Sequence, residues 1–174
     1  MPTRESITGK LRVERDALLQ RYRSLAADDL SRPCTDSEVD GSPPWSAKDH
    51  LAHLAMIERA FQSMVRRTLD GAERPVGLSG SSRDEVIANV HRNNQDNVDS
   101  HRDDDLETLL ADLVAARDET LGLLAELTDE QLALKIPGAP WADGTIGGVL
   151  MTNAYHEHQH WDWVAEGLGE TGSP

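Results

Sequence analysis

The sequence predicts an all-α protein, built as an antiparallel four-helix bundle with one additional helix. Apolar residues recur at intervals of three, four and seven over several long stretches, which is the period of an amphipathic helix. Hydrophobic residues make up 38% of the chain, and leucine and alanine, which favour helices, dominate among them. No stretch alternates β-branched residues and no Asn-Gly hairpin turn is present, so no strand is expected.

Two helices separated by a long loop are expected in the first part of the chain. The first runs over about residues 4–26, where apolar residues follow the helical period. Prolines and glycines interrupt the polar stretch 28–44 and predict a loop. The second helix covers residues 46–69, and Ser46 with Asp49 three positions later is close to a capping box at its start.

Three further helices and one short turn of helix are expected after residue 82. A third helix begins near Arg83, with a mostly polar face that buries little. Regularly spaced leucines predict a fourth helix over 106–127, after an acidic run that suits the positive end of the helix dipole. Residues 128–131 predict a capped short helix, and the last helix runs over about 145–166.

A dense cluster of amide side chains occupies residues 93–97 of the third predicted helix. The simplest interpretation is a solvated helix surface. In the alternative interpretation, Asn94 and Asn97 line a polar pocket.

Length, charge and cysteine content narrow the class of protein. A chain of 174 residues fits a single domain over 1–174. The net charge of -14 argues against nucleic acid as a partner and against adhesion to an anionic membrane. No apolar run approaches the roughly 20 residues of a membrane span, and no signal peptide is visible. A lone cysteine, Cys34, excludes an internal disulfide and indicates a reducing, cytoplasmic environment.

A pair of histidines in the last predicted helix is the strongest candidate for a functional site. His156 and His160 are four residues apart, so they lie one turn apart on the face that carries Val149, whereas His158 points elsewhere. Two imidazoles placed in this way can bind one metal ion, and a catalytic zinc-type site usually adds a third protein ligand. The alternative is a pair of surface or core histidines that binds nothing.

The same residues also match the His-Glu-x-x-His signature of metalloproteases, with Glu157 as the glutamate. No histidine follows His160, so the third ligand of a protease would have to be a carboxylate, from Asp162, Glu166 or Glu170.

Two segments of the sequence together resemble the DinB-like superfamily. The segment WSAKDHLAHLA, which begins at Trp45, is similar to the second-helix motif of that family, and YHEHQH, which ends at His160, is similar to its last-helix motif. The resemblance implies a helical bundle with a metal triad of His53, His156 and His160. His50 is an alternative first ligand, although it is out of phase with the family's motif. Zn²⁺, Ni²⁺ and Fe²⁺ all suit three neutral imidazoles.

The family includes mycothiol-dependent maleylpyruvate isomerases, bacillithiol S-transferases and colibactin-resistance hydrolases. The resemblance therefore implies a metal-dependent S-transferase or isomerase that acts on a small-molecule substrate and uses a low-molecular-weight thiol. The alternatives are a metal-dependent hydrolase in the same site and a non-catalytic metal-binding stress protein. A homodimer is also expected, since Leu11, Leu18 and Leu19 form a broad apolar arc on the first helix.

Overall fold

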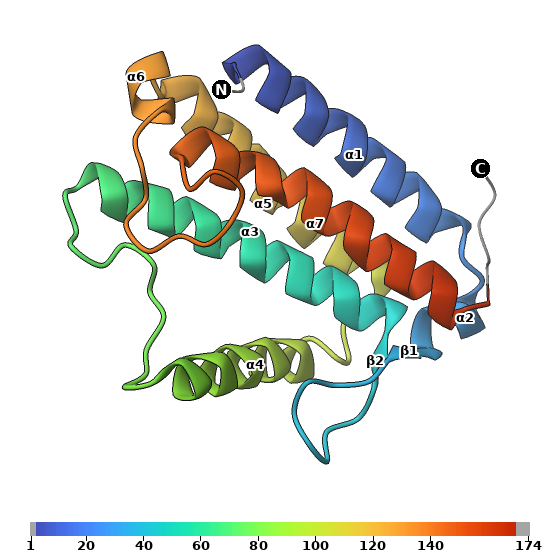
Figure 1. Ribbon diagram of the computed structural model, residues 1–174. Helices are drawn as coiled ribbons and strands as arrows, with labels where there is room; N and C mark the ends of the chain where they lie inside the picture. The colour runs from blue at the N-terminus through green and yellow to red at the C-terminus, as the bar shows by residue number, and fades with distance from the viewer. Residues whose placement is uncertain (1–2, 170–174) are drawn as a thin grey trace.

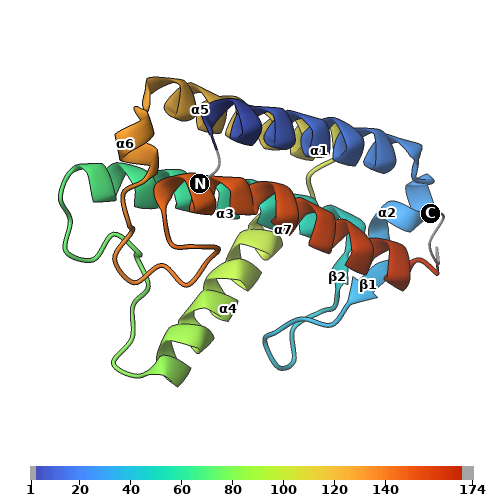
Figure 2. The same ribbon diagram turned by 45° about the horizontal axis from the view of Figure 1, so that its top comes forward.

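The computed structural model describes residues 3–169 as a bundle of four long helices. These are α1 (Arg4–Ser24), α3 (Ala47–Leu69), α5 (Leu106–Glu126) and α7 (Ile146–Gly167). Figure 1 shows α1 and α7 running in one direction and α3 and α5 in the other. The additional helix, α4 (Arg83–Ser100), leaves the bundle at an angle (Figure 2) and returns the chain so that α5 runs parallel to α3. The predicted all-α bundle is confirmed.

Side-chain caps set where the helices begin. Ser46 and Asp49 form a complete capping box at the start of α3, in which the Ser46 backbone N–H donates to Asp49 Oδ2 at 2.7 Å. A second capping box, from Thr128 and Gln131, starts the short helix α6 (Asp129–Leu132). Thr145 caps α7 without a capping box, because its hydroxyl oxygen accepts from the Gly148 backbone N–H at 3.0 Å. These bonds satisfy backbone N–H groups that have no partner inside the helix.

The loop predicted over 28–44 contains regular structure. It includes the short helix α2 (Ala27–Ser31) and the strand β1 (Pro33–Thr35), which pairs antiparallel with β2 (Trp45–Ser46). The expectation of no strand is therefore wrong, because a ladder this short leaves no alternating pattern in the sequence. Gly167 at the end of α7 permits the close approach of β1, since a Cβ atom there would lie 2.5 Å from Cys34 Cα.

The buried leucines, isoleucines and aromatic residues of the four long helices form two core clusters. One cluster lies around Ile7, Phe61, Leu124 and Leu150, near α6, and the other lies around Tyr22 and the first half of α3. Within residues 3–169, no helix combines the length with the apolar character that crossing a bilayer requires.

Replacing Leu113 with alanine is expected to lower the free energy of unfolding by about 2–5 kcal/mol, because this side chain is 0% exposed in the core. Denaturation in urea measures the change. Leu134, which is 46% exposed, provides the control, and Leu134→Ala should cost less than about 0.5 kcal/mol. A loss that small for Leu113→Ala would contradict the placement of α5 in the core.

The leucines of α1 on which the homodimer prediction depended pack inside the bundle of the single chain. Leu11 and Leu18 are buried in the core, and Leu19 is partly buried against it. The homodimer therefore stays a prediction that has lost its support from α1.

Candidate metal centre

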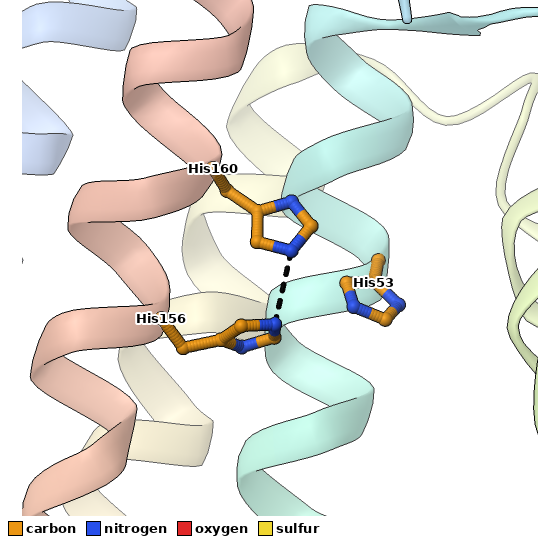
Figure 3. A group of neighbouring side chains, drawn as sticks. All are labelled: His53, His156 and His160. Atoms are coloured by element: carbon orange, nitrogen blue, oxygen red, sulfur yellow. Dashed lines mark hydrogen bonds between the residues drawn. The ribbon is translucent and has the colours of Figure 1, made fainter. Parts of the chain in front are cut away.

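Three histidines from two helices converge beneath the β1–β2 segment. His156 and His160 project from α7 toward α3, which carries His53 (Figure 3). One nitrogen from each ring lies within 4.8 Å of the others. The closest pair of nitrogens, His160 Nε2 and His156 Nε2, is 2.9 Å apart. Around a tetrahedral ion with metal–nitrogen bonds of 2.0–2.1 Å, the ligand nitrogens lie about 3.3 Å apart. Small rotations of the three side chains would bring their nitrogens to this separation, so the cluster can bind one ion.

Local sequence explains why the rings meet. The spacing of four residues stacks His156 above His160 on the inner face of α7. The capping box fixes the first turn of α3, so His53 lies in the second turn on the side that packs against α7. Trp45, immediately before α3, packs its indole against the His53 ring, with ring centroids 5.1 Å apart.

His50 contacts the triad without joining the group of converging nitrogens. Its Nδ1 lies 2.7 Å from His160 Nδ1, and its Nε2 lies 3.1 Å from the Thr35 hydroxyl oxygen. The ring is almost completely buried. From the sequence His50 was only an alternative first ligand, and these contacts were not predicted, because one depends on the packing of α3 against α7 and the other on the position of β1.

The remaining histidines lie outside the cluster. The His158 side chain is 56% exposed and faces Asp162, with 3.6 Å between His158 Nε2 and a carboxylate oxygen. His91 faces Glu38, and His101 faces Asp104. His158 therefore faces out as predicted. Asp162, a carboxylate weighed as a protease ligand, is on the same outer side, and Glu170 lies outside the described residues.

Burial keeps the clustered imidazoles neutral. It lowers the pKa of His50 and His156 to about 4, and together with the neighbouring imidazoles it lowers that of His53 to about 3. The pKa of His160 is lowered still further by burial and by the three other rings. His53 Nδ1 is buried without a hydrogen-bond partner. Neutral rings with an unpartnered nitrogen fit a divalent cation, because imidazole binds metals only in its neutral form.

The metal-free protein is expected to lose stability as pH falls from 6.5 toward 5. The unfolded chain protonates its histidines near pH 6.5, whereas the folded rings stay neutral to about pH 4, so the unfolded state binds more protons in this window. Urea denaturation at pH 7, 6 and 5 measures the trend. His158→Asn should keep the slope, and His156→Asn should reduce it; equal slopes in all three proteins would contradict neutral burial.

The same shifts change the expected pH dependence of metal affinity. The sequence alone predicts a fall through about pH 6.5, the ordinary histidine value. Because burial lowers the pKa of His156 to about 4, proton competition in the folded site should begin at a lower pH.

A pocket of about 450 Å³ opens beside the cluster. The three triad histidines and His50 line one side of it. Apolar and aromatic side chains line much of the rest, and Phe61 and Trp141 contact each other edge to face with ring centroids 5.2 Å apart. Trp141 comes from the loop before α7, and its position could not be predicted from spacing.

The amide cluster of α4 was expected either to form a solvated helix surface or to line a polar pocket, and each interpretation holds for some of its residues. Asn94 is buried and lines the pocket, whereas Asn97 does not. Gln95 is also buried, and its side-chain oxygen accepts hydrogen bonds from the Trp45 indole N–H at 3.0 Å and from the Ser37 hydroxyl at 2.6 Å.

A buried ion network lies on the inner faces of the four long helices. Arg15 of α1 and Arg117 of α5 both bind Glu58 of α3 and Glu157 of α7. Arg117 Nη2 donates to Glu157 Oε1 at 2.7 Å, and Arg117 Nε donates to Glu58 Oε1 at 2.7 Å. Burial opposes ionisation of Glu58, but Arg117 and Arg15 outweigh it and hold the pKa of this carboxyl below its usual value.

The network removes the support for the metalloprotease interpretation. In that reading Glu157 would act as the general base beside the metal ligands. Glu157 Oε1 instead accepts hydrogen bonds from Arg15 and Arg117, and Glu157 does not line the pocket.

A solved structure with the same fold corrects one sequence-based expectation. The chain is similar to the crystal structure of the colibactin self-resistance protein ClbS in complex with a dsDNA, with a TM-score of 0.74 and 16% identity over 99% of both chains. The expectation that nucleic acid is not among the partners is wrong as an inference from charge, because this fold is found with duplex DNA. Net charge is a sum over the whole chain and does not exclude local contacts.

Family membership follows from a match that covers most of the chain. No functionally curated protein matches the sequence significantly. The family model described as DinB superfamily matches residues 39–164, which include all four clustered histidines. This range begins in the β1–β2 loop and ends near the close of α7, so it also contains the pocket wall from α3 and α4. The chain belongs to the DinB superfamily.

Proposed function

We propose that this protein is a metal-dependent enzyme that uses a low-molecular-weight thiol in an S-transfer or isomerisation reaction. One observation carries the proposal: the neutral imidazoles of His53 and His160, which are buried, and of His156, which is partly buried, converge on the wall of a pocket large enough for a small molecule. A divalent cation such as Zn²⁺, Ni²⁺ or Fe²⁺, when bound, lowers the pKa of a thiol or water that it ligates.

The residues around the pocket hold the reactants and limit their contact with water. The three histidines hold the cation, and their burial keeps them neutral near pH 7. Phe61 and Trp141 form an apolar wall that excludes water from the reacting groups.

The thiol is expected to come from outside the chain. Cys34 is the only cysteine, and it does not line the pocket. Burial raises the pKa of its thiol, which disfavours the nucleophilic thiolate. A reducing, cytoplasmic setting, where small thiols are abundant, suits this requirement.

Turnover assays with and without thiol test the proposal. Protein purified without a histidine tag is loaded with Zn²⁺, Ni²⁺ or Fe²⁺ and mixed with an electrophilic chromogenic acceptor, in the presence or absence of 2-mercaptoethanol. We expect thiol-dependent conjugation above the uncatalysed rate, and loss of this rate in His53→Ala. Turnover of ester or amide substrates without thiol would favour the hydrolase alternative, and bound metal with no turnover would favour a metal-binding stress protein.

Contact with double-stranded DNA is a second candidate function. It is favoured by the similarity of the whole chain to ClbS, which was crystallised with a dsDNA. Fluorescence anisotropy of a labelled duplex, titrated with protein at low and at physiological salt, tests it. Contacts to phosphates would give an affinity that falls as salt rises. Unchanged anisotropy at both salt concentrations would reject it.

A further inference from the structure

The charges that line the pocket indicate which molecules it can take. Asp36 and Glu38, from the segment between β1 and β2, line it on the solvent side, and the Glu38 side chain is 52% exposed. None of the described residues that line the pocket is a lysine or an arginine. The neighbouring groove contains Arg92, which donates to Asn89. The pocket lining therefore combines neutral imidazole rings with two carboxylates from the segment that follows Thr35, whose hydroxyl oxygen lies 3.1 Å from His50 Nε2.

An anionic ligand would find no fixed cation here beyond the metal. A carboxylate distant from the ion would lie in a cleft with two like charges, on a protein of net charge -14. An ammonium group would gain attraction from Asp36 and from Glu38, which it would share with His91, and a neutral end would lose nothing. His91 also lines the pocket, and its Nε2 lies 3.5 Å from a carboxylate oxygen of Glu38. Among the described residues Asp36 forms no ion pair, so its charge is the less compensated of the two.

We infer, as an extension of the proposed function, that the pocket selects thiols and substrates whose free end is neutral or cationic, with Asp36 and Glu38 facing that end. Apolar walls from Ile57, Phe61 and Trp141 suit a hydrocarbon or aromatic part of the same molecules. Thiols that carry carboxylates at a distance from sulfur are disfavoured.

Binding of small thiols to cobalt-loaded protein tests this inference without any assay of turnover. Cysteamine and 3-mercaptopropionate have the same two-carbon spacing between sulfur and opposite charges. Each is titrated at fixed pH while the thiolate-to-cobalt absorption band is followed. We expect cysteamine to lose about three- to tenfold in affinity, relative to 3-mercaptopropionate, in Asp36→Asn and in Glu38→Gln. The two thiols differ in acidity, but this difference is the same for variant and wild-type protein. It therefore drops out when the affinity ratio of the two thiols in a variant is divided by that in the wild type.

Asp40→Asn is the matched control, because Asp40 is exposed in the same segment and does not line the pocket. The affinity ratio should be unchanged in this variant. Ratios unchanged in all three variants would overturn the inference while leaving thiol binding intact. Absence of the band with both thiols would instead reject the thiol-dependent function and this inference with it.

A separate observation, the contact between His50 and His160, gives His50 a role of its own. If His160 directs Nε2 at a metal, its proton is on Nδ1, which then donates to His50 Nδ1 at 2.7 Å. The proton of His50 is then on Nε2, which donates to the Thr35 hydroxyl oxygen at 3.1 Å. Both contacts are satisfied by this one set of tautomers. We propose that His50 is a positioning residue that fixes the tautomer and ring orientation of His160.

Metal affinity of His50 variants tests this role. Competition with a chromophoric chelator gives the zinc Kd, and His50→Leu should weaken it about 10–100-fold. His50→Gln, whose side-chain oxygen can still accept from His160, should recover part of the loss, and circular dichroism checks that each variant folds. Wild-type affinity in folded His50→Leu would overturn the proposal. A loss as complete as in His53→Ala, unrelieved by His50→Gln, would make His50 a ligand and overturn it as well.

Discussion

Alanine at His160 is expected to reduce bound metal from about one ion per chain to nearly none. His160 provides the nitrogen closest to His156, at 2.9 Å, and it is the triad ring that also contacts His50. Its removal deletes one candidate ligand and the ring that both His50 and His156 contact. Loss of one of three protein ligands usually destroys a site of this type. Elemental analysis after dialysis against trace zinc measures the metal content.

The other two members of the triad should behave in the same way, and a histidine of the same helix provides the control. His53→Ala and His156→Ala are expected to lose most of the metal. His158→Ala should retain it, because that side chain is exposed and faces Asp162. Full retention in the three triad variants would remove the basis of the proposed enzyme, and loss in His158→Ala would show that the wrong face of α7 had been assigned.

Alanine at Glu58 is expected to destabilise the fold by about 3–5 kcal/mol, the cost of leaving buried charges unpaired. Glu58 accepts from Arg15 Nη2 at 2.5 Å and from Arg117 Nε at 2.7 Å, and all three side chains are almost completely buried. Without it, two guanidinium groups would share Glu157 as their remaining carboxylate partner. Urea denaturation at pH 7 measures the effect.

The exposed ion pair between Arg59 and Asp112 is the matched control. It joins the same two helices, α3 and α5, at 2.6 Å, but its side chains are 36% and 40% exposed. Asp112→Ala should cost less than about 1 kcal/mol, because water screens the pair. If Glu58→Ala costs no more than Asp112→Ala, the network does not stabilise the bundle.

The network also affects the position of the candidate site. Glu157 is adjacent to His156 in α7, and Glu58 is on α3, the helix that carries His53. Arg15 and Arg117 thus hold together the two helices whose facing surfaces bring the triad into contact.

The sequence by itself determined the helices, the residues at which most of them begin, and which histidines of the last helix lie on its inner face. Apolar periodicity and caps such as Ser46 with Asp49 act over a few residues, so they can be read locally. The same periodicity placed His156 and His160 on the inner face of α7 and His158 on the outer one. The resemblance to a family added His53, which no local pattern on α3 would have selected over His50.

The charged network was not predicted from the sequence, although its residues carried a signal of it. Arg15 falls in phase with the apolar stripe of Ile7 and Leu11, and Glu157 falls in phase with Val149 and His160. Two arginines and two glutamates at such inward positions signal a buried network. Their pairing was not readable, because each partner comes from a different helix.

Only the tertiary structure decided how β1 and the loop before α7 close over the site. Thr35 reaches His50 because β1 pairs with β2, and Trp141 joins the pocket wall through a contact with Phe61, 80 residues earlier in the chain. Such contacts join residues that are far apart in the sequence and depend on how the helices pack. The spacing of residues along the chain does not predict them. Local rules therefore identified two of the three candidate ligands, His156 and His160, and long-range packing decided what surrounds them.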